Sequence, residues 1–278
     1  MFRRTNRIEV KSPEQILLMR QAGLVVGHTL ELLRASVRPG ITTGQLDGIA
    51  EDSIRSAGAT PSFLGYHGYP GSICTSVNDE VVHGIPGDRV LEAGDQISID
   101  CGAIVDGWHG DAAITVSVGE VDQAFVELSR VTEDALWRGL AAALVGGTVR
   151  DIGIAVESYV RAQHSGEDYG IVEEYVGHGI GTSMHMEPNV PNYDHGGKSP
   201  ALVPGMALAV EPMLCAGSRH TRTLEDDWTV VTQDGHRACH WEHTVAITPE
   251  GPWVLTALDG GAARFAALGV PSPALTRA

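Results

Sequence analysis

The segment 97–111, ISIDCGAIVDGWHGD, gives the clearest indication of structure in the chain. Asp106-Gly107, near its middle, is a dipeptide typical of two-residue turns between antiparallel strands. Apolar and β-branched residues flank this turn on both sides. We therefore expect one strand over 97–105, a second over 108–118, and a tight hairpin between them.

This hairpin brings two carboxylates to one face. Counting back from the turn places Gly102 opposite Asp111 and Asp100 opposite Ala113. Residues that lie opposite each other, or two apart on one strand, share a face of the sheet. Asp100 and Asp111 therefore project together, about 7–8 Å apart at the backbone. Gly102 places no side chain between them, and two converging carboxylates repel each other unless a cation neutralises them.

The hairpin alone leaves a second interpretation open, in which both aspartates are turn or edge residues on a hydrated face. A register shift of one residue would also send them to opposite faces. Three later segments add possible metal ligands: His178 in a Gly-rich turn at 176–181, Glu211 after an apolar run, and Glu242 within a strand-like segment at 238–248. Each of these alone is more often structural. Together with the aspartates they suit a pair of divalent ions about 3.5–4 Å apart.

The order of predicted elements indicates an internal duplication. Two helices followed by strands occur twice, and GIAEDS at 48–53 resembles GIAVES at 153–158, in the second helix of each half. An antiparallel sheet built from both halves would then lie under four helices, with a cleft where the halves meet. The helices are expected over 12–34, 43–58, 122–143 and 149–164, and the later strands around 171–177, 206–213, 228–233 and 238–248.

Composition narrows the class of protein. The 278 residues are 43% hydrophobic, which is enough for a sizeable core, and the formal net charge of −16 argues against nucleic acid as a partner. The four cysteines are far apart, which argues against a zinc ribbon or a disulfide framework. The polar N-terminus lacks a signal sequence, and no uninterrupted apolar run reaches membrane-spanning length. We expect a cytoplasmic protein with no membrane span.

Seven short segments resemble those of type I methionine aminopeptidases, in the same order, between about residues 12 and 255. They are GYHGYP at 65–70, VHGIP at 82–86, DGWHGD at 106–111, GHGIG at 177–181, MH at 184–185, VEPM at 210–213 and WEHT at 241–244. The resemblance implies the α+β "pita-bread" fold, a pseudo-twofold antiparallel sheet covered by two pairs of helices. It implies one catalytic domain at 12–258, a flexible basic arm at 1–11 and a peripheral tail at 259–278.

The resemblance also implies roles for individual residues. Two divalent ions, of Co²⁺, Mn²⁺, Fe²⁺ or Zn²⁺, would be held by Asp100, Asp111, His178, Glu211 and Glu242. Asp111 and Glu242 would bridge the ions, and His178 and Glu211 would complete one site. A metal-bridged hydroxide would attack the scissile carbonyl while Glu211 handles the proton. His83 would form a hydrogen bond near the scissile amide, and His185 would contact the substrate carbonyl.

A pocket for methionine would need apolar, polarisable walls. By position the candidates are Phe63, Tyr66, Tyr69, Cys74, Met184 and Trp228, although aromatic and Met residues near strands are more often plain core. Met184 departs from the family, in which an aromatic residue is common there. Hydrogen bonds around the site are the only role that we assign to His67, His109 and His243. The remaining histidines, including His240, are expected to be surface or structural.

The expected function is removal of the initiator methionine from nascent proteins whose second residue is small. The partners would be nascent polypeptide N-termini, at the ribosome, and the enzyme would act as a monomer. An alternative is a proline-directed relative, such as an Xaa-Pro aminopeptidase or dipeptidase, but these usually carry an additional N-terminal domain. A second alternative is a non-catalytic binding module, which we would expect to lack some of the metal ligands.

Overall fold

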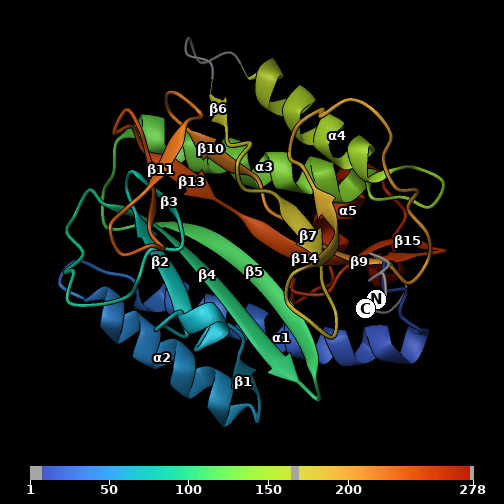
Figure 1. Cartoon of the computed structure of the whole chain (residues 1–278), viewed down its shortest axis with the longest axis horizontal. Helices are drawn as coiled ribbons and strands as arrows, with labels where there is room; N and C mark the ends of the chain where they lie inside the picture. The colour runs from blue at the N-terminus through green and yellow to red at the C-terminus, as the bar shows by residue number, and fades with distance from the viewer. Residues whose placement is uncertain (1–7, 164–168, 276–278) are drawn as a thin grey trace, which may run out of the picture.

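Two helices precede each set of strands in the computed structural model, which describes residues 8–163 and 169–275 (Figure 1). The helices are α1 (Pro13–Ser36), α2 (Thr43–Ser56), α3 (Gln123–Ala142), α4 (Val149–Ala162) and α5 (Ala262–Leu268), with short 3-10 helices η1 (Tyr66–Gly68) and η2 (Pro273–Leu275). The start of α1 was predicted correctly, because Ser12 and Gln15 form a reciprocal capping box.

Strands from both halves of the chain meet in one antiparallel sheet. Its main path is β1-β4-β5-β14-β9-β7-β8, with β2 beside β4 and β15 beside β14. Two smaller sheets have the orders β13-β10-β6 and β11-β12-β3. The strands are β1 (Thr60–Pro61), β2 (Ile73–Val77), β3 (Glu80–Val82), β4 (Gln96–Val105), β5 (Trp108–Ser117), β6 (Gly170–Ile171), β7 (Gly177–Gly179), β8 (Met186–Val190), β9 (Ala207–Val210), β10 (Met213–Cys215), β11 (Thr221–Thr223), β12 (Val230–Thr232), β13 (Ala238–His240), β14 (Glu242–Thr248) and β15 (Gly251–Val254).

The two helix pairs cover the same face of the main sheet. On the first half, Cys101 of β4 and Ala112 of β5 are fully buried in the same hydrophobic cluster as Leu30 of α1. On the second half, the indole Nε1 of Trp241 donates a hydrogen bond to Ser129 Oγ of α3, at 3.0 Å. Side chains that alternate with these therefore project from the opposite face, which the helices leave uncovered.

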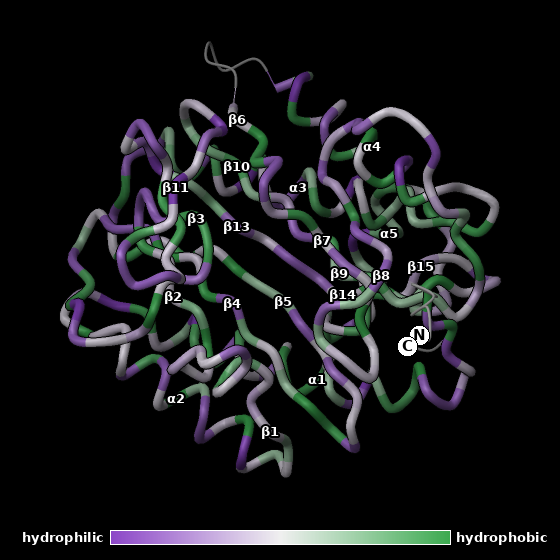
Figure 2. Tube along the Cα trace, viewed as in Figure 1, coloured by the Kyte–Doolittle hydropathy of each residue, from purple (hydrophilic) through white to green (hydrophobic). Residues whose placement is uncertain are grey.

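The distribution of polarity marks the centre of that uncovered face. In Figure 2 hydrophobic residues follow β4, whereas a hydrophilic stretch crosses the middle of the molecule where β13 leads into β14. This stretch includes His240, Glu242 and His243. Charged residues are rarely placed inside a sheet without a partner, so their position indicates a functional site.

Helix α1 is long and apolar enough to cross a membrane by length and composition alone. Half of its most apolar 18-residue window is buried inside the protein. Its Met19, Val26 and Leu33 are fully buried, and it packs against β4 and β5. This packing is that of a core helix.

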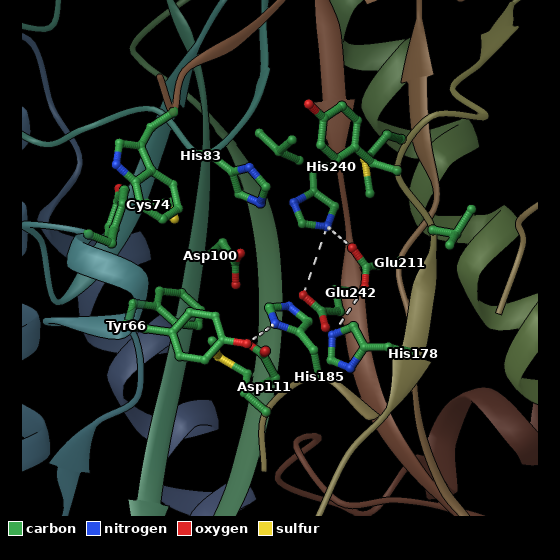
Figure 3. Close-up of a pocket in the computed structure, with 18 of the residues that line it drawn as sticks. Tyr66, Cys74, His83, Asp100, Asp111, His178, His185, Glu211, His240 and Glu242 are labelled. Carbon is green, nitrogen blue, oxygen red and sulfur yellow. Dashed lines mark hydrogen bonds and ion pairs between the residues drawn. The ribbon is translucent and has the colours of Figure 1, made fainter. Parts of the chain in front are cut away.

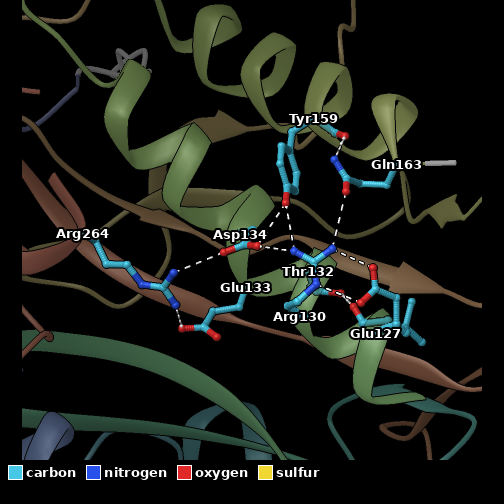
Figure 4. A network of polar contacts seen from close by, with 9 residues as sticks. Glu127, Arg130, Thr132, Glu133, Asp134, Tyr159, Gln163 and Arg264 are labelled. Carbon is cyan, nitrogen blue, oxygen red and sulfur yellow. Dashed lines mark hydrogen bonds and ion pairs between the residues drawn. The ribbon is translucent and has the colours of Figure 1, made fainter. Parts of the chain in front are cut away.

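A polar network joins α3, α4 and α5 (Figure 4). Arg130 of α3 donates hydrogen bonds to Asp134 at 2.6 Å and to Tyr159 of α4 at 3.3 Å. Arg264 of α5 donates to the other Asp134 oxygen at 3.2 Å, and also contacts Glu133. Polar contacts of Arg130 and Arg264 around Asp134 therefore hold the three helices together.

The end of the predicted N-terminal arm packs against the domain, while residues 1–7 lie outside the described part of the chain. Lys11 is only 5% exposed, and its backbone N–H donates to the Gly205 carbonyl at 2.8 Å. Glu9 accepts a hydrogen bond from Thr182 Oγ1 at 2.6 Å. The described part of this segment thus supports the loop that follows β7.

The segment after 258 was expected to be peripheral, and its residues 276–278 lie outside the described ranges. Its helix α5 nevertheless places Phe265, which is fully buried, in the largest hydrophobic cluster. The Phe265 ring meets Trp137 of α3 edge-on, with centroids 5.7 Å apart. Part of this segment is therefore integral to the core.

Candidate metal centre and active site

The predicted hairpin and its register are confirmed. Strands β4 and β5 pair with Asp100 opposite Ala113 and Gly102 opposite Asp111. Both turn residues, 106–107, have positive φ angles of 49° and 80°, as a tight hairpin turn requires. Asp100 and Asp111 both line one pocket on the uncovered face of the sheet.

Gly102 lies opposite Asp111, as predicted, and the structure gives a second reason for a glycine at this position. A Cβ added to it would come within 2.7 Å of Phe63 Cε1 and 2.8 Å of Ser62 Cβ. Glycine therefore allows the Phe63 ring to lie directly against β4, at the wall of the pocket.

Strand β14 brings the second half of the chain to this hairpin. It lies between β5 and β9, with Glu242 opposite Ala113 and His243 opposite Val210. Because Ala113 also faces Asp100 on its other side, the carboxylates of Asp100 and Glu242 flank it on the same face. Glu242 is only 2% exposed.

His178 and Glu211 come from the neighbouring strands. His178 pairs with Ala209 of β9, and Glu211 follows two residues later, so both project to the same face. The His178 Nε2 to Glu211 Oε1 distance is 3.4 Å. The expectation that His178 lies in a turn was wrong: it lies in β7 and is 7% exposed. Its flanking glycines allow close approach of neighbouring backbone, as Gly177 does beside Ala209.

His240 is the residue that the sequence analysis misplaced. It was expected to be surface or structural, but it is 2% exposed and lines the pocket. Its Nε2 lies 3.8 Å from Glu242 Oε2 and 3.9 Å from Glu211 Oε2 (Figure 3). The signal for it was its position two residues before Glu242, the spacing of residues that share a face of a strand.

Burial raises the pKa of the carboxyl groups in this pocket. It raises the pKa of Asp100 to about 7, against the opposing effect of a hydrogen bond with Asp111. Burial, followed by the charge of Glu242, raises the pKa of Asp111 well above its usual range. The pKa of Glu211 and that of Glu242 are raised in the same way, first by burial and then by neighbouring carboxylates. All four carboxyl groups can be ionised at the same time only when bound cations neutralise their charge.

The pocket fits divalent metal ions by a second observation. Buried polar atoms without a hydrogen-bond partner gather in it: Asp100 Oδ1, Asp111 Oδ1, Glu211 Oε1, His240 Nε2 and Glu242 Oε1. Two groups of three residues could each hold a metal ion, because the ligand atoms within each group lie within 4.8 Å of one another. One group is Asp111, His178 and Glu242, and the other is Glu211, His240 and Glu242. Glu242 is common to both groups, whereas Asp100 belongs to neither. Carboxylate and imidazole donors in this arrangement suit borderline divalent ions.

The histidines of the pocket are neutral at neutral pH. Burial, then the charge of His185, lowers the pKa of His178 to about 3. Burial, then the charge of His83, lowers the pKa of His240 to about 3. Their contacts with Glu211 and Glu242 are therefore not ion pairs at neutral pH, and neutral imidazole is the form that binds metals.

His83 and His185 lie at the edge of the carboxylate cluster, as Figure 3 shows. The His185 ring is 4.4 Å from that of His178, and its Nδ1 shares a hydrogen bond of 2.8 Å with the Tyr66 hydroxyl. His83 has a positive φ of 61°, and its ring meets Tyr175 edge-on at 5.6 Å. Burial lowers the pKa of His83 to about 4, and also lowers that of His185.

Two further histidines near the pocket, His109 and His243, support neighbouring segments. His109 Nδ1 shares a hydrogen bond of 3.1 Å with Ser62 Oγ. His243 Nδ1 shares one of 2.8 Å with Thr256 Oγ1, and its ring meets Trp137 of α3, on the face opposite the pocket. His243 thus alternates with Glu242 along β14.

The predicted methionine-pocket residues come together beside the cluster, in a pocket of about 330 Å³. They are Phe63, Tyr66, Tyr69, Cys74, Met184 and Trp228. The rings of Tyr69 and Trp228 meet edge-on at 5.0 Å. The sequence analysis did not identify the remaining wall, formed by Val82, Glu174, Tyr175, Val176 and Met213. Val82 and Met213 lie in β3 and β10 of the smaller sheets, and residues 174–176 lie in the connection between β6 and β7, so no short sequence pattern marks this wall.

Comparison with known proteins identifies the family. The model of metallopeptidase family M24 matches residues 17–249. The chain belongs to metallopeptidase family M24. It is therefore a metal-dependent peptidase, and the predicted resemblance is confirmed.

Two relatives within family M24 are about half identical to this chain. Methionine aminopeptidase 1 of Mycobacterium tuberculosis (strain CDC 1551 / Oshkosh) is 52% identical over 249 residues, which is 88% of this chain and 94% of that protein. Methionine aminopeptidase 1 of Bacillus subtilis (strain 168) is 50% identical over 246 residues, or 88% of this chain and 98% of the relative.

Solved structures confirm the predicted pita-bread fold of family M24. The crystal structure of methionine aminopeptidase from Rickettsia prowazekii superposes with a TM-score of 0.86 at 37% identity, covering 90% of this chain and all of that one. Prolidase from Pyrococcus furiosus superposes with a TM-score of 0.71 at 22% identity, which shows the fold alone. This chain covers only 65% of the prolidase.

Proposed function

We propose that this M24 peptidase removes the initiator methionine from nascent polypeptides whose second residue is small. The observation that carries the proposal is the contact between an apolar, sulfur-containing wall and a buried carboxylate cluster within one pocket. The relatives at about 50% identity, which are named methionine aminopeptidases, support the same substrate.

The wall of the pocket accounts for the side-chain preference. Cys74 and Met184 are nearly buried beside the rings of Phe63 and Tyr69. A thioether packs favourably against aromatic rings and other sulfur-containing side chains, because all of these are polarisable. Methionine is therefore the side chain that this wall is best suited to hold.

Two divalent ions complete the proposed site. Asp111 and Glu242 would be shared by both ions. His178 and Glu211, whose Nε2 and Oε1 atoms lie 3.4 Å apart, would complete one site, and Asp100, close to Asp111, would belong to the other. Divalent ions in such a pair lower the pKa of a bound water and polarise a carbonyl group. The donor set accepts Co²⁺, Mn²⁺, Fe²⁺ or Zn²⁺, and availability in the cell decides which is used.

The protein's own groups position the substrate and move the proton. Glu211 lies beside the cluster and has a raised carboxyl pKa, which suits a group that accepts a proton and returns it to the leaving amine. His83 and His185 are neutral and reach the pocket without belonging to either donor group. Each can donate one hydrogen bond to the scissile amide or its carbonyl, where negative charge develops.

The partners and the compartment are part of the same proposal. Nascent N-termini would be met at the ribosome in the cytoplasm, by a monomeric enzyme. The four buried, unpaired cysteines suit a reducing compartment.

A tripeptide panel tests the proposal directly. Metal-free protein is reloaded with Mn²⁺, Co²⁺, Fe²⁺ or Zn²⁺, its metal content is measured, and it is given Met-Ala-Ser, Met-Leu-Ser and Ala-Pro-Ser. Free methionine from Met-Ala-Ser, with the other two peptides spared, is expected. Asp111→Asn serves as the control, and it should lose both metal and activity. Preference for Ala-Pro-Ser would contradict the proposal, as would full activity of the Asp111→Asn variant.

A further inference from the structure

The backbone of His240 is fixed in place by the hairpin that carries the two aspartates. Its N–H lies within 3.2 Å of both Ser98 Oγ of β4 and Thr115 Oγ1 of β5. Thr115 Oγ1 in turn donates to the His240 carbonyl at 2.8 Å. The two hydroxyls also bond each other at 2.9 Å. This anchoring directs the His240 ring into the pocket from the end of β13.

The ring nitrogen that enters the pocket has no hydrogen-bond partner. His240 Nε2 is buried, and its distances to Glu242 Oε2 and Glu211 Oε2, 3.8 and 3.9 Å, are too long for hydrogen bonds. They match the separation of two ligands on one ion, since ligands about 2.0–2.2 Å from a metal lie roughly 3–4 Å from each other. A buried nitrogen without a partner costs free energy unless something binds it.

We propose that His240 Nε2 is a direct ligand of the metal ion that Glu211 and Glu242 would hold. The proposal rests on the two-ion part of the proposed function and adds a residue that the family resemblance did not assign. His178 Nε2 lies 3.4 Å from Glu211 Oε1, so this ion would receive two imidazoles and the other ion none.

A second imidazole changes the metal preference of this ion's site. Oxygen-only sites favour hard ions such as Mg²⁺ and Mn²⁺, whereas nitrogen ligands favour Fe²⁺, Co²⁺ and Zn²⁺. His240 therefore strengthens the preference of this site for Fe²⁺, Co²⁺ and Zn²⁺ over that of the neighbouring site, which would be formed by carboxylates alone. Without His240 the ion would keep only the imidazole of His178.

His240→Gln and a matched control, His243→Gln, separate this role from a structural one. Both substitutions replace a histidine near Glu242, but His243 lies on the opposite face and bonds Thr256. Each protein is checked for folding by circular dichroism, made metal-free, and titrated calorimetrically with Zn²⁺. The number of imidazoles per zinc is then measured on the loaded proteins by X-ray absorption fine structure.

We expect the wild type and His243→Gln to hold two zinc ions and about one imidazole per zinc, averaged over both sites. His240→Gln should show about half that imidazole count. Its affinity for the more weakly bound ion should fall by about tenfold or more. An unchanged imidazole count in His240→Gln overturns the proposal, and so does weaker binding with an unchanged count, which would mean that His240 acts through another ligand. Fewer than two ions in the wild type would instead contradict the two-ion proposal, whatever the count.

Discussion

Removal of the Asp100 carboxylate should stabilise the metal-free protein, although it removes a group of the active site. Its ordinary pKa of 3.8 is raised to about 7 by burial. A carboxyl whose pKa is raised in the folded state does not oppose folding below pH 3.8. It opposes folding increasingly as the pH rises from 3.8 to about 7, because the unfolded chain ionises first.

The size of this effect follows from the two pKa values. Their difference corresponds to roughly 4 kcal/mol at 1.36 kcal/mol per pH unit. Part of the Asp100 residue reaches solvent in the pocket, and water lowers the cost, so we expect Asp100→Asn to gain about 2 kcal/mol at pH 8. Little gain is expected at pH 4, where the carboxyl is protonated in the fold.

Urea unfolding of chelator-treated protein at pH 4, 6 and 8 measures this gain. Asp106→Asn is the matched control, since it makes the same change at an exposed turn position of the same hairpin. With divalent metal added the order should reverse, because metal binding stabilises the wild type more. The reasoning is refuted if metal-free Asp100→Asn is no more stable than the wild type at pH 8, or if its gain is independent of pH.

Two further substitutions test the pocket wall and the C-terminal segment. Gly102→Ala places a methyl group within 2.7 Å of the Phe63 ring. KM for methionyl peptides, measured by steady-state kinetics, should therefore rise about fivefold while the metal content stays unchanged. An unaltered KM would contradict a role of Phe63 in binding methionine. Phe265→Ala should cost about 3–5 kcal/mol in urea unfolding at constant metal content; a cost below about 1 kcal/mol would show that α5 contributes little to the core.

The sequence was sufficient for the hairpin and the order of elements, because both depend on short-range patterns. The turn at 106–107 determines the register, and the register determines that Asp100 and Asp111 share a face. The capping-box patterns that begin at Ser12 and Thr148 locate the starts of α1 and α4 equally well. Local chemistry of this kind needs no knowledge of distant contacts.

The errors concern residues whose environment depends on pairing between distant segments. The glycines around His178 suggested a turn, but they are needed because β7 lies close to its neighbours in the sheet. His240 was expected to be surface or structural, and its place in the pocket depends on the contact of β13 with the hairpin at Ser98 and Thr115. Phe265 becomes a core residue only because α5 folds back onto α3. Among these residues only His240 had a signal within a short window of sequence, its position two residues before Glu242.

The place of β14 in the sheet has a consequence for biosynthesis. This strand is among the last parts of the catalytic region to leave the ribosome, yet it lies between β5 and β9 at the centre of the sheet. Until it emerges, both neighbours present open edges, which are prone to join other chains. A product truncated before residue 242 would also lack Glu242, which both donor groups share. Premature termination therefore yields aggregation-prone, inactive fragments, and only a polypeptide that includes β14 can cleave other chains.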